Sequence, residues 1–311
     1  MKIVALAGGV GGAKLVDGLA HLLLPKDLTI VVNTGDDFDH LGLYISPDVD
    51  TVCYTLAGLA NPETGWGRID ETFQALENIQ KLGGPSWFHI GDKDLATHLE
   101  RTRRLHDGQS LCEITQKFCR SWGIRHIVLP MSNQPVRTMV DTIEYGELAF
   151  QEYFVHQNCE PKVKGFRFVG IDSALPSPGI LEAIDKADAI VFCPSNPWVS
   201  INPILALVGL RSALAKKNVL AVSPIIGGQA IKGPAAKMCI EMGLRPSALA
   251  VAQNYTEILS GFVLDIVDAE LAREFSIPVT ITNTIMKTLD DRCRLAQDVL
   301  NFIQSFQSST E

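Results

Sequence analysis

The sequence lacks any apolar run long enough to cross a membrane. Hydrophobic residues make up 46% of its 311 positions, yet no uninterrupted stretch approaches the roughly 20 residues that a membrane-spanning helix needs. The apolar run after Lys2 resembles the start of a signal peptide, but four glycines and Lys14 interrupt it and no convincing cleavage site follows. We therefore expect a cytoplasmic protein that has no membrane partner.

The chain also has too few basic residues for a protein that binds nucleic acid non-specifically. Its 27 Lys and Arg residues face 35 Asp and Glu residues, which gives a formal net charge of −8 and disfavours contact with a phosphate backbone. Cysteine pairs of the CxxC type are missing too, because the seven cysteines are scattered singly. This pattern argues against a zinc or redox site and indicates reduced thiols. We expect no nucleic-acid partner, and any phosphate must be held locally.

Glycine is concentrated near the N-terminus. The strand-like run 3–7 leads into two glycine pairs, Gly8–Gly9 and Gly11–Gly12, and a helical pattern continues from Lys14. A strand that turns into a helix through glycines exposes backbone N–H groups at the positive end of the helix dipole, where a phosphate can approach. Lys14 replaces the third glycine of the dinucleotide fingerprint, and no Ser or Thr follows it as in a P-loop. We expect a phosphate-bearing ligand; the alternative is a tight turn packed against the sheet.

Strand and helix patterns alternate through much of the chain. The first two buried strand runs end in glycine-rich or polar residues, which is typical of a doubly wound parallel sheet with its ligand crevice at the carboxyl ends of the strands. From Asp50 to Gly123 only helical runs occur. We predict an α/β fold with a Rossmann-like, mainly parallel sheet formed by residues 1–46 and 124–311, and a smaller helical cap domain formed by residues 47–123.

Beyond the cap, the sheet is expected to resume at 126–132. It should continue through alternating strands that turn at 145–147, and through another strand at 164–170. Three further βα units follow, the last with its strand in ALAVAQNY at 248–255. The run PVTITNT at 278–284 is then the final strand before the terminal helix.

Acidic residues gather between the second strand and the cap. Asp36, Asp37 and Asp39 follow the strand, and Asp48 and Asp50 lie within ISPDVD. Mg²⁺ prefers oxygen ligands and is usually held by one or two carboxylates together with substrate phosphates. We take Asp36, Asp37 and Asp48 as the candidate metal ligands. Helix capping by Asp48 or Asp50 is the alternative explanation.

Cations are unusually frequent in the segment IGDKDLATHLERTRR. Lys93, at the mouth of the cap, could meet a phosphate or a polar ring. Arg101, Arg103 and Arg104 are expected to form a solvated helix face. We expect His98 to pack within a helix rather than to act as a catalytic base.

Two later loops add polar groups to the same edge of the sheet. In PSNPWVSINP, Ser195, Asn196 and Ser200 could donate hydrogen bonds to a nucleotide, with simple helix capping as the alternative. In SPIIGGQAIKGPAAK, the pair Gly227–Gly228 exposes N–H groups and Lys232 adds charge. Two glycine-rich loops and a serine loop indicate a polyphosphate. No Ser/His/Asp or Cys/His pairing stands out, so we expect catalysis by positioning and charge neutralisation, as in phosphoryl transfer.

The chain resembles the CofD family, the 2-phospho-L-lactate transferases of deazaflavin coenzyme biosynthesis, over about residues 1–300. The stretches that carry the resemblance are AGGVGGAKL, ISPDVDTV, GDKDLATH with DGQSL, and PSNPWVSINPIL with SPIIGGQAIKGPAAK. The resemblance implies a Rossmann-like sheet with a small helical domain. It also implies a transferase that uses Mg²⁺ to move a phospho-acid from a guanosine diphosphate (GDP) conjugate to the terminal ribityl hydroxyl of Fo, a deazariboflavin, releasing GMP.

By position, the resemblance places Asp50 and Lys93 at the Fo site. Asp50 is then the catalytic carboxylate that orients or deprotonates the hydroxyl. At the position of Lys93 the family motif commonly has arginine. A lysine keeps the positive charge but cannot form the two parallel hydrogen bonds of an arginine side chain. The resemblance places the nucleotide site on the glycine and serine loops, at Gly9, Gly11, Gly12, Lys14, Ser195, Asn196, Ser200, Gly227, Gly228 and Lys232.

Two other functions compete with the transferase. A related group of CofD-like regulators binds nucleotide-sugars without known catalysis, and an NAD-dependent dehydrogenase would require the fingerprint that Lys14 breaks. The segments GDKDLATH and ISPDVD favour the transferase, which we expect to be a homodimer. The transferred acid stays open, because phospholactyl, phosphoenolpyruvyl and phosphoglyceryl groups differ by so little that a few pocket contacts decide between them.

Overall fold

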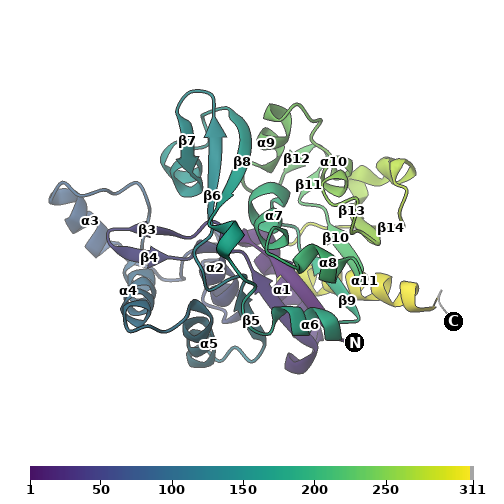
Figure 1. Cartoon of the computed structure of the whole chain (residues 1–311), viewed down its shortest axis with the longest axis horizontal. Helices are drawn as coiled ribbons and strands as arrows, with labels where there is room; N and C mark the ends of the chain where they lie inside the picture. Colours follow the sequence, from purple (N-terminus) through teal and green to yellow (C-terminus); the bar gives the residue numbers. More distant parts are fainter. Residues whose placement is uncertain (309–311) are drawn as a thin grey trace.

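Seven parallel strands form the central sheet of the computed structural model, which describes residues 1–308. Their spatial order is β14-β13-β10-β9-β1-β2-β5 (Figure 1). The strands span β1 Ile3–Ala7, β2 Leu28–Val32, β5 Ile127–Pro130, β9 Ala189–Phe192, β10 Asn218–Val222, β13 Gly261–Asp265 and β14 Val279–Thr282. Every neighbouring pair is parallel. The predicted Rossmann-like, doubly wound α/β fold is confirmed.

Helices cover both faces of this sheet. Successive residues along a strand point to opposite faces, and they enter two separate hydrophobic cores. Ile3 and Ala5 of β1 lie in one core, whereas Val4 and Leu6 lie in the other. The first core is closed by α1 (Gly9–Leu22), α2 (Pro47–Leu56), α5 (Leu111–Ser121) and α11 (Leu289–Ser308). The second is closed by α6 (Ile180–Lys186), α7 (Asn202–Leu205), α8 (Leu210–Leu214), α9 (Ala235–Glu241) and α10 (Ala248–Gln253). Burial on both faces explains why the inner strands of the sheet are largely apolar.

The segment from Asp50 to Gly123 contains helices and no sheet strand, as expected. Besides α2 and α5 it holds α3 (Gln74–Lys81) and α4 (Asp92–His106), and its one β-bridge joins Ala60 to Arg68. A short hairpin, β3 (Phe38–His40) and β4 (Leu43–Ile45), precedes it. Because α2 packs on α1 and α5 packs on β5, part of the segment belongs to the layer over the sheet. The division into two domains stays a prediction.

The prediction that the strands after β5 continue the main sheet is wrong. β6 (Arg137–Thr142) pairs antiparallel with β7 (Gly146–Ala149) and β8 (Val163–Val169) in a separate three-stranded sheet. Their alternating burial suits a sheet with one solvated face, which is an antiparallel feature. The turn also lies earlier than expected, at 143–145, where the Thr142 hydroxyl accepts a hydrogen bond from the Tyr145 N–H.

The expected strand at 248–255 is wrong as well. This stretch forms α10, and the strand lies further on, at β13. The Ser247 hydroxyl accepts a hydrogen bond from the Ala250 N–H at 3.1 Å, a helix cap, and three alanines in six residues favour the helix that follows. No helix in residues 1–308 is long and apolar enough to span a bilayer.

Candidate active site

A cavity of about 580 Å³ lies at the carboxyl ends of the strands. It sits where the strand order reverses, between β1 and β9, which is the usual ligand crevice of a doubly wound sheet. The loops after β1, β2, β9, β10 and β14 all contribute to its lining. Of the residues predicted from sequence, the cavity brings together Gly9, Gly11, Lys14, Asp36, Asp48, Ser195, Asn196, Ser200 and Lys232.

The glycine loop forms the floor of this cavity. Helix α1 begins directly at Gly9, and the Gly9 N–H donates to Asp48 Oδ1 at 2.7 Å. The Gly8 N–H donates to Ser195 Oγ at 3.0 Å, and that hydroxyl donates back to the Gly8 carbonyl at 2.7 Å. A carboxylate is therefore already held at the anion-binding end of α1, next to a serine from the loop after β9.

Gly11 and Gly12 let α1 approach the loop after β9. A Cβ atom on Gly11 would lie 2.3 Å from the Pro194 carbonyl oxygen, and one on Gly12 would lie 2.5 Å from Ser195 Oγ. Both distances are far below van der Waals contact. Gly11 lines the cavity, but Gly12 is not among the described lining residues, so Gly12 acts on the site through packing against Ser195.

Asp36 and Asp48 form an acidic pair at the cavity wall. Asn33 Nδ2 donates to Asp48 Oδ2 at 2.9 Å, whereas Asp36 Oδ1 is buried and receives no hydrogen bond from residues 1–308. Burial raises the pKa of Asp48 to about 6. Burial, and then the charge of Asp48, raises the pKa of Asp36 well above its ordinary value. Two crowded carboxylates with an unpartnered oxygen fit a hard divalent cation such as Mg²⁺.

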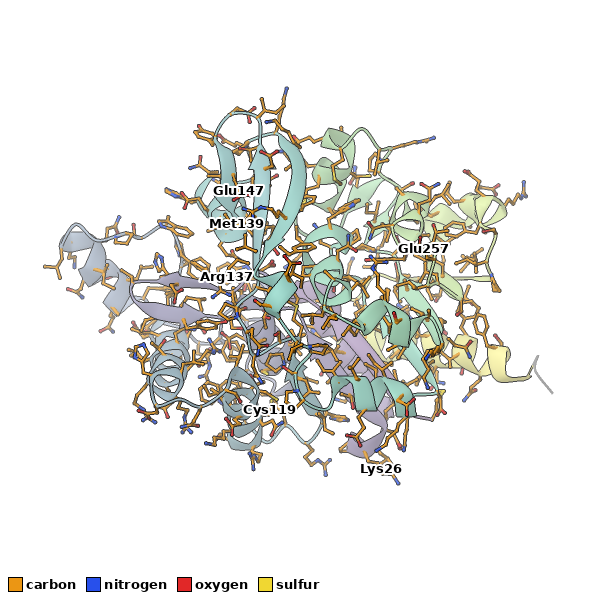
Figure 2. The ribbon with its side chains drawn as sticks, viewed as in Figure 1. Lys26, Cys119, Arg137, Met139, Glu147 and Glu257 are labelled. Atoms are coloured by element: carbon orange, nitrogen blue, oxygen red, sulfur yellow. The ribbon has the colours of Figure 1, made fainter. Side chains whose placement is uncertain are left out.

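Asp37 has a different environment from Asp36. Its carboxylate accepts hydrogen bonds from Tyr44 Oη and Ser46 Oγ, each at 2.9 Å. Burial raises the pKa of Asp37 to about 7, while the nearby Arg137 guanidinium opposes that rise. Arg137 also lies over the Tyr44 ring at 5.3 Å, at the base of β6 (Figure 2). Asp37 does not belong to the described cavity lining.

Two lysines supply positive charge inside the cavity. Lys14 Nζ donates to the Met286 carbonyl at 2.8 Å, and Lys232 Nζ donates to the Thr64 carbonyl. Burial, followed by the charges of Arg292 and Lys232, lowers the pKa of Lys14. Two neighbouring ammonium groups whose hydrogen bonds go to neutral carbonyls are suited to bind an anion.

The serine loop lines the cavity, whereas the second glycine pair lies outside its described lining. Ser195, Asn196 and Ser200 line the cavity, although Asn196 also caps the following turn by accepting from the Trp198 N–H at 3.0 Å. Gly227 and Gly228 form the two-residue turn between β11 (Ile225–Ile226) and β12 (Gln229–Ala230), with φ of +57° and +75°. The Gly227 N–H donates to Asp268, and neither glycine lies in the described lining.

Aromatic side chains that were not predicted from the sequence also line the cavity, and we call them the aromatic wall. We use this name for Trp66, Phe88, His89, Phe150 and Phe154, which all line the cavity. The Phe150 and Phe154 rings stack, with centroids 5.4 Å apart and planes at 10°. The signal was their spacing of four residues, which places two rings on one side of a helical turn.

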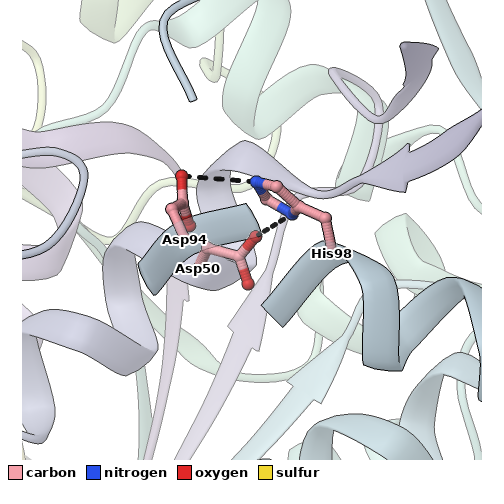
Figure 3. Close-up of side chains that lie close together, drawn as sticks. All are labelled: Asp50, Asp94 and His98. Carbon is pink, nitrogen blue, oxygen red and sulfur yellow. Dashed lines mark ion pairs between the residues drawn. The ribbon is translucent and has the colours of Figure 1, made fainter. Parts of the chain in front are cut away.

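The residues expected at the Fo site lie outside the described lining of this cavity. Lys93, on the first turn of α4, is exposed, and its Nζ donates to the Ile69 carbonyl at 3.1 Å. Asp50, on α2, is buried next to Asp94 and His98 (Figure 3). It also forms an ion pair with Arg101. Burial raises the pKa of Asp50, and Arg101 opposes this effect.

The predicted solvated face of α4 is wrong for Arg101, which is only 1% exposed. It forms an ion pair with Asp50, and this pairing lets a guanidinium be buried. Arg103 does lie on the exposed face, and it pairs with Glu100 and Asp107. The expectation that His98 packs within a helix is confirmed, since it is 2% exposed on α4.

The fold and the cavity together define a Rossmann-like α/β protein with a cavity at the switch point of the sheet. A solved structure of a Bacillus halodurans protein, described as a member of the UPF0052 family, has the same fold. The TM-score is 0.64 over 96% of this chain and 98% of that chain, at 16% sequence identity. A second structure of a Bacillus halodurans protein gives a TM-score of 0.59 at 17% identity.

The family profile described as 2-phospho-L-lactate transferase CofD matches residues 3–294, and the chain belongs to this family. A Streptomyces griseus relative named phosphoenolpyruvate transferase is 41% identical over 99% of this chain and 100% of its own length. A Thermobifida fusca protein of the same name is 45% identical over 87% and 88%. A Methanocaldococcus jannaschii protein named 2-phospho-L-lactate transferase is 39% identical over 97% and 98%. The family inferred from the sequence motifs is confirmed, and the chain is a transferase.

Proposed function

We propose that the chain transfers a phospho-acid group from a GDP conjugate to the terminal ribityl hydroxyl of Fo. In this reaction the hydroxyl oxygen bonds to the phosphorus that carries the acid. The bond from that phosphorus to the bridging oxygen breaks, GMP leaves with that oxygen, and the hydroxyl proton is released. The observation that carries the proposal is the layout of the cavity. Its glycine loop, lysines and acidic pair suit a diphosphate with Mg²⁺, and its aromatic wall suits a planar ring system.

The transferred acid is proposed to be phosphoenolpyruvate. The bacterial relatives that bear this name are 41% and 45% identical to the chain. The archaeal relatives named for 2-phospho-L-lactate are 38% and 39% identical. Because the two groups differ only by a double bond, a few contacts within the cavity would decide between them.

In the proposed mechanism, Asp36 and Asp48 would hold Mg²⁺, which neutralises phosphate oxygens when bound. Lys14, Lys232 and the first-turn N–H groups of α1 that Asp48 does not engage, at Val10 and Gly11, would bind and orient the diphosphate. Asp50 would accept a hydrogen bond from the acceptor hydroxyl and align it with the departing GMP. Positioning and charge neutralisation then supply the catalysis.

Binding of Fo is the direct test of this proposal. Titration of the purified protein with Fo, in the presence of GDP and Mg²⁺, should perturb the absorbance of the deazaflavin in a saturable way. A protein that binds GDP and leaves the Fo spectrum unchanged would contradict the transferase, and would favour a nucleotide-binding regulator. We also propose that the protein is a homodimer and is cytoplasmic. Light scattering on the same sample measures its mass in solution and so tests the dimer.

A further inference from the structure

Asp50 is fixed by a buried arginine from another helix. The Arg101 guanidinium, on α4, donates through one terminal nitrogen to Asp50 Oδ1. Its other terminal nitrogen lies 3.3 Å from the Tyr44 carbonyl and 3.2 Å from His98 Nδ1. Asp50, His98 and Arg101 are all at most 5% exposed. Arg101 therefore joins α2, α4 and the β4 strand around a single carboxylate.

The same cluster continues to a second carboxylate. His98 Nε2 lies 3.3 Å from Asp94 Oδ2 (Figure 3). Tyr54 Oη donates to the other oxygen of Asp94, Oδ1, at 2.6 Å. Asp50, Asp94 and His98 are close enough to hold a metal ion. However, the Arg101 guanidinium already supplies the positive charge at Asp50, so we interpret this cluster as a support for Asp50 rather than as a second metal site.

One oxygen of Asp50 is buried and has no hydrogen-bond partner within residues 1–308. Oδ1 is engaged by Arg101, whereas Oδ2 accepts no hydrogen bond from any residue in the described part of the chain. His98 Nδ1 lies 3.7 Å from Oδ2, which is beyond hydrogen-bond distance. Asp48 and Thr51, on the same helix, both line the cavity, so Asp50 lies close behind its wall.

We propose that Arg101 is a positioning residue for the transfer reaction. It holds Asp50 through Oδ1 and so leaves Oδ2 for the acceptor hydroxyl. This inference rests on the proposed function, in which Asp50 aligns that hydroxyl. The planar guanidinium can reach the carboxylate, the Tyr44 carbonyl and the His98 ring at once, whereas a lysine in its place would offer only a point charge.

A double-mutant cycle tests this role. The variants are Arg101→Met, Arg101→Lys, Asp50→Asn and the double variant Asp50→Asn with Arg101→Met. We expect Asp50→Asn to lower kcat by about 100-fold, the scale of a lost positioned acid/base group. Arg101→Met should lower kcat similarly, with GDP binding unchanged. The double variant should be no slower than either single variant, because Arg101 acts through Asp50.

Two further variants separate positioning from a general effect on the fold. Arg101→Lys should recover at least about 10-fold of the kcat lost in Arg101→Met, because it restores a charge beside Asp50. Arg103→Met is the matched control, since Arg103 lies on the same helix and is exposed. It should retain wild-type kcat and KM.

Three results would overturn the inference: an Arg101→Met enzyme with normal kcat, single-variant losses that multiply in the double variant, or an Arg101→Lys enzyme no faster than Arg101→Met. Should Arg101→Met fail to fold, Asp50→Asn still decides. In Asp50→Asn the amide oxygen can still accept a hydrogen bond from Arg101, while the amide nitrogen takes the place of Oδ2. Full kcat in this folded variant would therefore also refute the positioning role of Arg101. A wild-type enzyme inactive with every GDP-linked acid refutes the proposed function instead.

Discussion

Gly12 controls the distance between α1 and the loop that carries Ser195. A Cβ atom at this position would lie 2.5 Å from Ser195 Oγ, the hydroxyl that bonds both the N–H and the carbonyl of Gly8. Gly12→Ala should therefore displace Ser195 and destabilise the fold by about 1–3 kcal/mol, as overpacking does. We also expect GDP affinity to fall. Urea unfolding and calorimetry measure the two effects.

The control for this substitution is Gly165→Ala, because no atom lies within 4 Å of a Cβ built on Gly165. The control should change neither stability nor GDP affinity. A Gly12→Ala protein that matches it in both measurements would contradict the packing role of Gly12.

Asp48 is a predicted metal ligand that lines the cavity and is held there by hydrogen bonds from the Gly9 N–H and Asn33. In Asp48→Asn the oxygen can still accept from the Gly9 N–H, but one anionic ligand is lost. A bound metal supplies several kcal/mol of transition-state stabilisation, so turnover at fixed Mg²⁺ should fall by about 100-fold or more. The Mg²⁺ concentration needed for half-maximal activity should rise. An Asp48→Asn enzyme with an unchanged Mg²⁺ dependence would show that Asp48 serves only to accept hydrogen bonds from the Gly9 N–H and Asn33.

The place of a residue in the cavity could be predicted from the sequence where the local backbone pattern alone puts that residue at the edge of the sheet. Gly9, Lys14 and Asp48 follow from the strand-turn-helix pattern, since residues after parallel strands share one edge of the sheet. The burial of Arg101 could not be predicted, because its partner Asp50 lies 51 residues away and only tertiary packing brings the two together. The helical periodicity of α4 is equally consistent with a solvated arginine.

At the scale of elements, the aromatic wall depends on the helical turn that carries Phe150 and Phe154. The two rings stack on each other and face the cavity, so Phe154→Ala removes one face of the proposed ring site. We expect Fo to bind about 10-fold more weakly, within the 0.5–1.5 kcal/mol range of an aromatic pair plus the lost buried area. GDP affinity should not change.

Phe275→Ala provides a comparison outside the described cavity lining, where Phe275 packs against Phe262 of the core. It should reduce stability without a selective effect on Fo. Equal losses of Fo and GDP affinity in Phe154→Ala would argue against a separate ring site.

Elements were predictable where burial was uniform. The β1, β2, β9 and β10 strands are apolar except at Thr29 and Asn218, because helices cover both faces of the sheet. The helix α10 was mistaken for a strand because a run of five apolar or small residues fits either structure, whereas the Ser247 side chain caps a helix. The separate sheet of β6, β7 and β8 could not be placed from pattern alone, since alternation does not specify which sheet a strand joins.

For the molecule as a whole, buried carboxylates make stability depend on pH. Burial raises the pKa of Asp37 from 3.8 to about 7, so between these values the folded protein holds a proton that the unfolded chain has lost. The free energy of unfolding contributed by Asp37 is therefore fully present below pH 4 and is lost as pH rises toward 7. Asp48, with a pKa raised to about 6, acts in the same direction.

Urea unfolding in EDTA at pH 5.5 and 7.5 measures this effect. Asp37→Asn should reduce the loss of stability between the two pH values, because the amide does not titrate. Added Mg²⁺ should stabilise the wild type more at pH 7.5, where Asp36 and Asp48 are more fully ionised. A wild type and an Asp37→Asn variant with the same pH dependence would show that Asp37 keeps an ordinary pKa.

The central claim is that this cavity joins a phospho-acid from a GDP conjugate to Fo. The most direct measurement is mass spectrometry of the products formed from Fo, Mg²⁺ and each of three donors, GDP-linked phosphoenolpyruvate, 2-phospho-L-lactate and 3-phosphoglycerate. We predict an Fo adduct that carries the phospho-acid, GMP in equal amount, and the fastest formation with the phosphoenolpyruvate donor. The absence of both an Fo adduct and GMP with all three donors would contradict the claim.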